Sequence, residues 1–352
     1  MRLPNILSFP IYALDISDQS YKYLYLAKNA DGTTVTVSDF GEGEIPPGVI
    51  EQGEIKKRDI LVAILRDVFH KRNIRFVALS LPEEQGFLRS VPLSGIRQNE
   101  IAHALQYQLE EHIPLSPAEA FFDYTVASVE KDHIDVAVNA FPKQVVESYA
   151  ALVYDAGATL VYMESELTSA FRATIPRGYL ETAFIIDWGH TRTSFSIVED
   201  GTLRFAATAP IGGKVLNEAI VKNLGVDVAR AEALKVEMGF SRDVATLDVF
   251  NALVPAVTAV KEEAEKYIDF WQSHSERKAS PEKIFLSGGD ANLRGLPEYL
   301  SHEFGVEVSL ANPWVNVAFP PRYLPDIELK DSLRFVSAIG LGIEGQREGE
   351  II

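Results

Sequence analysis

The sequence predicts an α/β protein built from two copies of one three-stranded unit, with a small α+β insertion in the first copy. In residues 11–40, a buried strand ends near Asp15, and a polar turn, an alternating strand, an Asp-Gly turn and a β-branched strand follow. Residues 183–209 repeat this order, with the first strand ending at Asp187. Because such a match is improbable by chance, we interpret the pattern as an internal duplication.

Each copy continues with helices and a further strand. Residues 58–72 carry apolar side chains at helical spacing and predict a helix with one buried face, before a strand at 75–81. After the second copy, we expect a helix over 214–223, a strand over 283–289 and a helix over 296–304. The two copies therefore share more than their first three strands.

The remaining segments predict an insertion and a helical part. Residues 82–160 indicate a strand, a helix, two or three strands and a second helix, whereas 225–276 indicate helices with a break near Gly239. An apolar last helix at 333–345 is expected to dock on the first copy. The predicted domains are 1–81 with 333–352 (first half), 82–160 (inserted α+β subdomain), 161–180 (crossover helix), 181–213 with 280–332 (second half) and 214–279 (helical subdomain).

Composition excludes several functional classes. The formal net charge is −17 and the longest basic run is Lys56-Lys57-Arg58, so no nucleic-acid partner is expected. The absence of cysteine excludes disulfides and thiolate metal sites. No stretch of 18 apolar residues occurs, and the N-terminal residues lack the apolar core of a signal peptide. We therefore expect a cytoplasmic protein that reaches a membrane only through a partner, without direct insertion.

The two acidic turns are the candidate ligand site. A turn that ends a buried strand points its N–H groups outward and can cradle phosphate oxygens, and an aspartate there can hold Mg²⁺ through waters. Two halves of the same fold that face each other would bring Asp15 and Asp187 to the walls of one cleft. Gly189 would permit a left-handed backbone in the second turn. The hydroxyl groups available there are those of Thr191, Thr193 and Ser194. The alternative is that both are ordinary polar turns that cap strands.

Two glycine pairs could also contact a ligand. Gly288 and Gly289, in LSGGDANLRGL, follow a strand and precede a helix, where glycine lets a flat ring approach the backbone. Gly212 and Gly213 could contact phosphate or simply start a helix. Neither pair is specific by itself, because any loop between a strand and a helix can use glycine.

The chain resembles the actin/Hsp70-type ATPases and, among them, the PilM family of type IV pilus assembly proteins, which are related to the cell-division protein FtsA. The resemblance covers nearly the whole chain and is carried by IPPGVIEQGEI, HIPLSPAEAFFDY, IIDWGHTRTSFSIVEDGTLRF with PIGG, and IFLSGGDANLRGLPEYL. It implies a duplicated ribonuclease-H-like (actin/Hsp70-type) fold with an inserted small α+β subdomain. It also implies that ATP is bound with Mg²⁺, the metal being held through water by Asp15 and Asp187.

The family pattern implies three nucleotide-binding loops, at residues 15–22 and 187–194 for phosphates and at 287–293 for adenosine. The stretch AEALK implies that Glu232 and Lys235 lie near ribose and adenine. The implied nucleotide-binding residues are Asp15, Ser17, Ser20, Lys22, Asp187, Gly189, Thr191, Thr193, Ser194, Gly212, Gly213, Glu232, Lys235, Ser287, Gly288, Gly289 and Asn292. Glu164 and Glu166 lie where the family can orient an attacking water, and are the candidate catalytic residues.

Three residues depart from the family pattern. Ser17 stands where the family has glycine, and a serine forced to positive φ would cost about 1–2 kcal/mol. Asp18 would place a carboxylate where phosphate oxygens approach, and Asp290 replaces a usual glycine. We therefore expect ATP to bind and efficient hydrolysis to be less favoured.

The resemblance implies an ATP-binding scaffold of a type IV pilus, competence or secretion complex at the inner membrane. Its partners would be the N-terminal cytoplasmic peptide of a PilN-like membrane protein and other pilus assembly components. Three alternatives remain: an active ATPase or small-molecule kinase, which needs a placed base; an FtsA-like filament former; and a pseudo-ATPase without nucleotide.

Overall fold

The computed structural model describes residues 9–275 and 279–348. These residues form two compact units. Unit 1 is formed by the described parts of residues 1–176, 313–328 and 335–352, and unit 2 by those of 177–312 and 329–334. Each unit contains one five-stranded sheet.

The sheet of unit 1 has the order β10-β6-β1-β2-β3. Its strands are β1 (Ile11–Ile16), β2 (Ser20–Lys28), β3 (Val35–Glu44), β6 (Phe76–Leu81) and β10 (Thr159–Ser165). Strands β1, β2 and β3 are joined antiparallel, whereas β6 is parallel to both β1 and β10. Between β3 and β6, the chain forms a short hairpin of β4 (Ile50–Glu51) and β5 (Glu54–Ile55), followed by α1 (Arg58–Arg72).

Helices cover both faces of this sheet, because successive side chains of a strand point to opposite sides. Leu14 of β1 packs in a core with residues of α1 and α3 (Lys143–Asp155). Its neighbour Ala13 packs in a second core with α4 (Glu166–Thr174) and α10 (Val336–Glu348). All six side chains of β1 are buried, which explains why this strand is uniformly apolar up to its aspartate.

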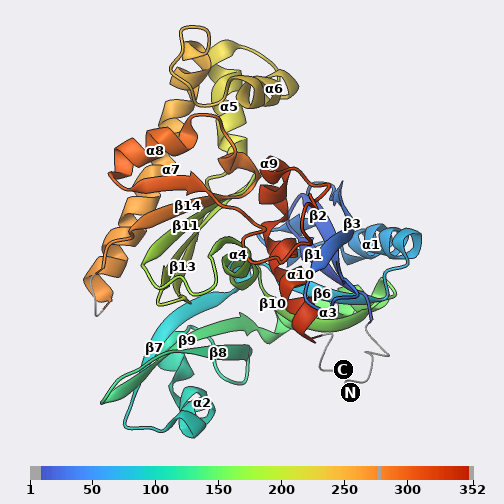
Figure 1. Cartoon of the computed structure of the whole chain (residues 1–352), viewed down its shortest axis with the longest axis vertical. Helices are drawn as coiled ribbons and strands as arrows, with labels where there is room; N and C mark the ends of the chain where they lie inside the picture. The colour runs from blue at the N-terminus through green and yellow to red at the C-terminus, as the bar shows by residue number, and fades with distance from the viewer. Residues whose placement is uncertain (1–8, 276–278, 349–352) are drawn as a thin grey trace. The chain divides into compact units, whose positions relative to one another are not determined.

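The insertion in unit 1 has its own sheet and its own core. Its elements are η1 (Glu83–Gln85), β7 (Phe87–Ser94), η2 (Gln98–Glu100), α2 (Ile101–His112), β8 (Ala120–Val129) and β9 (His133–Pro142). The sheet order is β7-β9-β8, and Leu105 and Leu109 of α2 pack against it. Figure 1 shows these strands and α2 as a separate group.

The sheet of unit 2 has the order β13-β12-β11-β14-β15. Its strands are β11 (Ala183–Trp188), β12 (Thr193–Glu199), β13 (Thr202–Ala209), β14 (Lys283–Ser287) and β15 (Glu307–Leu310). As in unit 1, the first three strands are antiparallel, and β14 is parallel to β11 and β15. The predicted duplication is therefore confirmed, with β11 corresponding to β1, β12 to β2, β13 to β3, β14 to β6 and β15 to β10.

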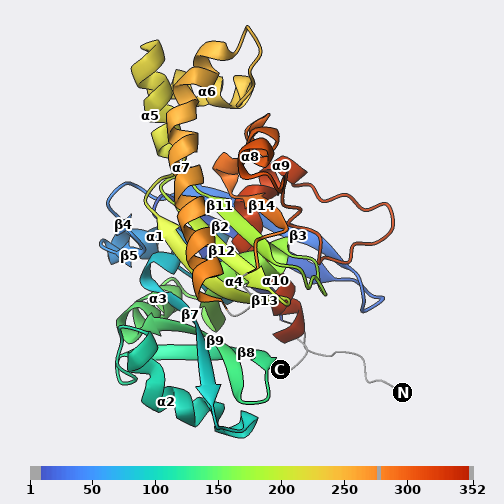
Figure 2. The ribbon, with the colours of Figure 1, turned by 90° about the vertical axis from the view of Figure 1, so that its left-hand side faces the viewer.

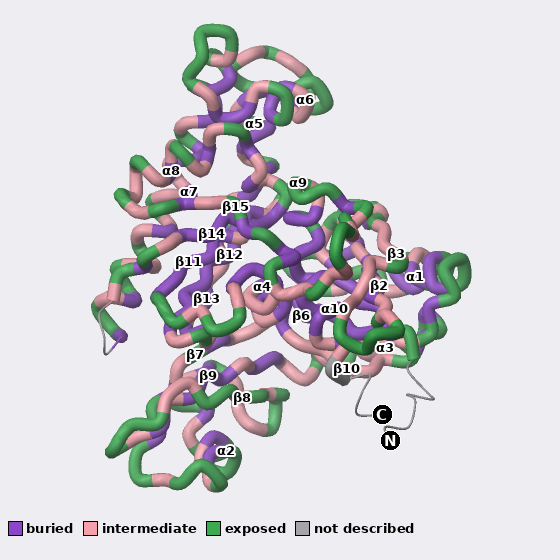
Figure 3. Tube along the Cα trace, viewed as in Figure 1, coloured by how far each residue is buried: buried purple, intermediate pink, exposed green. Residues whose placement is uncertain are grey.

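Five helices of unit 2 share one large apolar core with its sheet, namely α5 (Gly213–Leu224), α6 (Val228–Met238), α7 (Leu247–His274), η3 (Gly289–Ala291) and α8 (Leu296–Phe304). Further along the chain, α9 (Leu329–Ser332) and η4 (Leu333–Phe335) lead from unit 2 to unit 1. Figure 2 shows α7 running along β12 from α5 and α6. Its residues Val257 and Ala264 pack in the same core as Phe195 of β12. In both sheets the inner strands β1, β6, β11, β12 and β14 are mostly buried, whereas the outer strands β3 and β10 are mostly intermediate (Figure 3).

The structure corrects three predicted domain boundaries. Helix α3 and strand β10, placed in the insertion 82–160, belong to the core and sheet of the first half. The predicted crossover helix 161–180 is instead the end of β10 followed by α4, because the β-branched and aromatic run TLVYM favours a strand. Residues 313–328, predicted in the second half, pack in unit 1, where Asn316 donates hydrogen bonds to the carbonyl groups of Arg172 and Ile175.

Candidate functional site

The two predicted acidic residues occupy the same position in the two sheets. Asp15 pairs with Lys22 across β1 and β2, and Asp187 pairs with Ser194 across β11 and β12. In both units, the aspartate is therefore the penultimate residue of the central strand, at the carboxyl edge of the parallel pair and close to the following turn. The sequence equivalence of Asp15 and Asp187 thus holds in three dimensions.

The turn after β1 is closed by its own side chains. The backbone N–H of Ser17 donates to the carbonyl oxygen of Ser20 at 2.8 Å, and Lys22 Nζ donates to Ser20 Oγ at 3.1 Å. Asp15 accepts a 2.7 Å hydrogen bond from Ser80 Oγ and lies 3.9 Å from Lys22 Nζ. Ser17 does not have positive φ, so the expected backbone strain at this position is absent.

Asp18 is bound to the neighbouring β4–β5 hairpin. Its two carboxylate oxygens accept hydrogen bonds from the backbone N–H groups of Gln52 and Gly53, both at 3.0 Å. These residues form the tight turn of the β4–β5 hairpin and have φ of 51° and 74°. Both oxygens of the carboxylate thus hold this hairpin.

The turn after β11 is built around a close approach of two loops. Gly288, which follows β14, has φ of 86°, and a Cβ atom there would lie 2.6 Å from Asp187 Oδ1 and 2.3 Å from the carbonyl oxygen of Trp188. Glycine is therefore required at 288. Gly189, by contrast, does not have the left-handed backbone that we expected. Its N–H closes the turn by donating to the carbonyl oxygen of Arg192 at 2.9 Å.

Most predicted hydroxyl donors of this turn are used inside the sheet. Thr193 Oγ1 donates to the carbonyl oxygen of Ile211 at 2.6 Å, and Ser194 Oγ lies 3.2 Å from Thr208 Oγ1. Both residues are buried, whereas Thr191 is partly exposed. Ser287, at the end of β14, is fully buried and its Oγ has no hydrogen-bond partner. Of the predicted hydroxyl groups, only that of Thr191 is therefore accessible to a ligand at this turn, together with backbone groups.

Gly212 and Gly213 start α5 and hold the β11–β12 turn. The N–H groups of Gly213 and Lys214 donate to the carbonyl oxygens of Gly189 and His190 at 2.9 and 2.8 Å. A Cβ atom at Gly212 would lie 2.4 Å from the same His190 oxygen. Of the two interpretations of this pair, the structure supports a helix start, because the first N–H groups of the helix are already used.

Lys235 and Glu232 of α6 are brought to the loop after β14. Lys235 Nζ lies 2.5 Å from Asp290 Oδ1 and 2.9 Å from Glu232 Oε2, and its side chain is only 3% exposed. Asn217 of α5 donates to the same oxygen of Glu232 at 2.5 Å. Asn292, two residues beyond Asp290, is partly exposed. The predicted residues 187–194, 232–235 and 287–293 of unit 2 thus form one cluster.

Charge within the cluster controls the titration of Asp290. Burial alone would raise the pKa of this carboxyl group, but the nearby His190 ring and the charge and hydrogen bond of Lys235 outweigh it and hold the pKa below its ordinary value of 3.8. Asp290 is therefore ionised at neutral pH.

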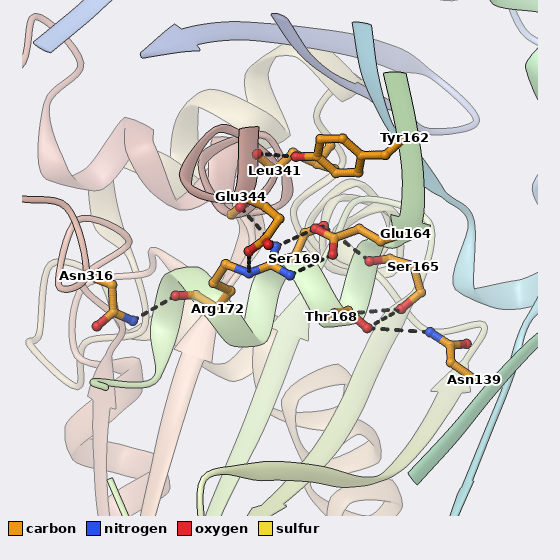
Figure 4. A network of polar contacts seen from close by, with 11 residues as sticks. Asn139, Tyr162, Glu164, Ser165, Thr168, Ser169, Arg172, Asn316, Leu341 and Glu344 are labelled. Carbon is orange, nitrogen blue, oxygen red and sulfur yellow. Dashed lines mark hydrogen bonds and ion pairs between the residues drawn. The ribbon is translucent and has the colours of Figure 1, made fainter. Parts of the chain in front are cut away.

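Glu164 takes part in an ion-pair network within unit 1 (Figure 4). Arg172 donates to both of its carboxylate oxygens, at 2.5 and 2.7 Å, and Ser169 Oγ donates to one of them at 2.7 Å. Arg172 Nε also lies 3.1 Å from Glu344 Oε2. Glu166, at the first turn of α4, is buried. The geometry at Glu164 favours a structural role, and the catalytic roles of both glutamates stay predictions.

Several residues of this site were not found from the sequence. The equivalence of Ser80 to Ser287 could have been found, because RFVALSL and KIFLSGG align at that serine. Asn217 and Arg172 carry no such signal, since their partners depend on how helices pack. Among the described residues, no group of three or more His, Asp or Glu side chains could hold a metal, and no described helix is long and apolar enough to cross a membrane.

Comparison with solved structures defines the class of protein. The ethanolamine utilization protein EutJ from Carboxydothermus hydrogenoformans is 14% identical with a TM-score of 0.56, and the match covers 94% of this chain and 88% of that one. MreB5 of Spiroplasma citri bound to ADP is 15% identical with a TM-score of 0.53, covering 97% and 99%. With its duplicated topology, the chain therefore has the actin-like ATPase fold.

The match extends to one family within this class. The PilM–PilN type IV pilus biogenesis complex contains a chain that is 21% identical with a TM-score of 0.79, and the match covers 96% of this chain and 99% of that one. The model of the type IV pilus assembly protein PilM family matches residues 13–346. The chain belongs to that family.

Proposed function

We propose that this protein is a nucleotide-binding scaffold of a type IV pilus assembly complex, and that nucleotide binds at the loop cluster of unit 2. The observation that carries this proposal is the convergence of Asp187, Gly288 and Lys235, from three separate elements. Asp187 and Gly288 come from segments with their own sequence patterns, and Lys235 from the segment AEALK that the family resemblance implied. Support also comes from MreB5 of Spiroplasma citri, whose structures with ADP and with AMPPNP share this fold.

Each part of the cluster has a proposed role. The turn after β11 would contact phosphate oxygens through backbone N–H groups and Thr191. The loop at Gly288 and Gly289 would let a flat base approach the backbone, and Glu232 and Lys235 would lie near ribose and adenine. The Lys235 ammonium group, on the side of Asp290 and of His190 in the β11–β12 turn, would face the phosphates. Mg²⁺ suits Asp187 through water, because Mg²⁺ keeps several of its waters.

The turn after β1 is less suited to hold a metal directly. Asp15 is 7% exposed, accepts a hydrogen bond from Ser80 and lies near the Lys22 ammonium. That Asp15 acts on the same nucleotide as Asp187 stays a prediction, and Asp15→Asn tests it by titration with ATP and Mg²⁺.

We further propose that nucleotide acts as a ligand that shifts a conformational equilibrium rather than as fuel. Glu164, the candidate for orienting a water, has both carboxylate oxygens bound to Arg172. Orienting water would require this ion pair to open, which favours slow hydrolysis or none. An active ATPase or kinase is the competing function, and a turnover of roughly 1 per second or more would support it.

The proposed partner is the cytoplasmic N-terminal peptide of a PilN-like inner-membrane protein. Similarity to the chain in the PilM–PilN complex supports this choice. The insertion offers a suitable surface, because β8 is an edge strand and its Phe121 is 48% exposed, whereas Phe122 and Tyr124 pack against the insertion core. The protein would then lie on the cytoplasmic side of the inner membrane, held there by its partner and by other pilus assembly components.

Isothermal titration with ATP and Mg²⁺ tests the nucleotide site. We expect binding by the unmodified protein and a loss of at least about tenfold in Asp187→Ala. The matched control is Asp269→Ala, which removes an exposed aspartate of α7 in the same unit. No binding by the unmodified protein would indicate a pseudo-ATPase, and equal affinity in Asp187→Ala would place the nucleotide elsewhere.

A pulldown with the N-terminal peptide of the PilN-like protein encoded by the same organism tests the partner. We expect capture of the full chain and weaker capture of Phe121→Ser. Exposed Tyr154 of α3, also in unit 1, offers the matched control Tyr154→Ser. Capture that both substitutions leave unchanged would exclude β8 as the docking strand, and absence of capture would refute the partner.

A further inference from the structure

The carboxylate of Asp290 lies where three other elements of unit 2 meet. Its Oδ1 is 2.5 Å from Lys235 Nζ of α6, and its Oδ2 is 3.7 Å from His190 Nδ1 of the β11–β12 turn. Its side chain is 12% exposed. The third element is the start of α5, where Gly213 lies directly against the carboxylate.

The start of α5 has room for Asp290 only because residue 213 is glycine. A Cβ atom at Gly213 would lie 1.9 Å from Asp290 Cγ and 2.1 Å from both of its oxygens, distances that no side chain tolerates. Gly213 does not have positive φ, so backbone conformation does not require glycine here. The glycine is therefore explained by the carboxylate that it accommodates.

Lys235 is neutralised before any ligand arrives. Its ammonium group is nearly buried between Asp290 and Glu232, and Glu232 is itself held by Asn217. An ammonium group has three hydrogen-bond donors and two carboxylates already contact this one, so another anion must either displace a carboxylate or share the ammonium group with both. Of the two carboxylates that bind Lys235, that of Asp290 belongs to the loop of Gly288 and Gly289. This loop is part of the proposed nucleotide site.

We propose that Asp290 is an internal anion that competes with nucleotide phosphate for Lys235 and His190, and so weakens binding at this site. The inference rests on the proposed nucleotide site and specifies what regulates its affinity. An incoming triphosphate must displace the carboxylate or bind beside it. In both cases the phosphate and the Asp290 carboxylate repel each other, and the partial burial of this position strengthens the repulsion.

Removing the charge of Asp290 should therefore strengthen ATP binding. Asp290→Asn keeps the shape of the side chain and releases Lys235, which retains Glu232 as a partner. The released Lys235 ammonium group can then form a hydrogen bond to a charged phosphate, and such bonds are stronger than those between neutral groups. The affinity for ATP should therefore rise by about ten- to a hundredfold. Adenosine, which has no phosphate, should bind both proteins equally.

The experiment is isothermal titration of the full chain with ATP and Mg²⁺, and separately with adenosine. The variants are Asp290→Asn, Asp290→Gly as a second variant that leaves space, and Asp269→Asn as the matched control that removes an exposed charge of α7. We expect tighter ATP binding in both Asp290 variants and no change in Asp269→Asn. Circular dichroism establishes that each variant is folded.

The outcomes separate the two proposals. Equal ATP affinity in the unmodified protein and in the folded Asp290 variants would overturn the inference and leave the nucleotide site intact. An equal gain for adenosine would also overturn it, because the effect would then be steric. Failure of the unmodified protein and of all variants to bind ATP would refute the nucleotide site, and the inference with it. ATP binding that appears only in the Asp290 variants would support the inference directly.

Discussion

Replacing Arg172 by methionine should destabilise unit 1 by about 3 kcal/mol. The guanidinium group binds both oxygens of Glu164 and lies 3.1 Å from Glu344, and the three side chains are 15–21% exposed. Methionine leaves two carboxylates in this place without their cation. Removing one partner of a buried ion pair costs about 3–5 kcal/mol, and partial exposure places this network at the lower end.

The change should be visible as a lower melting temperature. In a unit of about 150–250 residues, 1 kcal/mol shifts the midpoint by about 2–4 °C, so Arg172→Met should melt about 6–12 °C below the unmodified protein. Differential scanning calorimetry measures this shift. Glu164→Gln should give a smaller decrease, because Glu344 still balances the arginine.

Arg97→Met is the matched control for this measurement. Arg97 also pairs with a glutamate, Glu100, but its side chain is 79% exposed. Exposed pairs contribute about 0–1 kcal/mol, so this variant should melt within about 4 °C of the unmodified protein. If Arg172→Met melts no lower than Arg97→Met, the network contributes no stability. If Glu164→Gln abolishes ATP hydrolysis without changing the melting temperature, Glu164 is catalytic and our structural interpretation is wrong.

Three further predictions follow from single residues. Asp18→Ala should destabilise the β4–β5 hairpin by about 1 kcal/mol, because two N–H groups lose their acceptor. Hydrogen exchange at the amides of Gln52 and Gly53 should become faster, and unchanged exchange rates would contradict this prediction. Gly288→Ala should lower the free energy of unfolding by about 3 kcal/mol or more, since the backbone conformation at this position is nearly restricted to glycine and a Cβ atom would collide with β11. An unchanged midpoint of denaturant unfolding would refute this prediction. The depressed pKa of Asp290 should give stability that is present above pH 3.8 and lost as the pH falls through the lower folded value. Asp290→Asn should lack this acid-dependent loss in denaturation curves, and equal loss in both proteins would exclude Asp290 as its source.

Much of the fold could be predicted, because it depends on local patterns. The two three-stranded units were found from short-range signals, namely buried strands and two Asp-Gly turns, and both turns contain residues with positive φ. The helix expected at 58–72 has those bounds in the structure, as has the helix at 296–304. Periodicity identifies a buried face, but it does not say which sheet that face covers. For this reason α3 was assigned to the insertion although it packs on the first sheet.

The candidate site was predictable in position and less so in detail. The segments around Asp187 and Gly288 were identified from their own sequence patterns, whereas Lys235 was implied only by the family resemblance of AEALK. The partners of Asp18 and Glu164 were not, because they depend on residues brought near by folding; Asp18, for example, binds an N–H group 34 positions away. The ion pair of Lys235 with Asp290 spans 55 positions and likewise has no sequence signal.

The order of segments in unit 1 limits how the protein can be divided. The chain leaves this unit after residue 176 and returns to it twice, and its last return supplies α10, whose apolar side chains complete the core beneath β1 and β2. A fragment that stops at 176 would therefore expose that core to water and should aggregate. Separate production of unit 1 would require residues 313–328 and 335–348 to be rejoined to it, by co-expression or by linkers that replace residues 177–312 and 329–334.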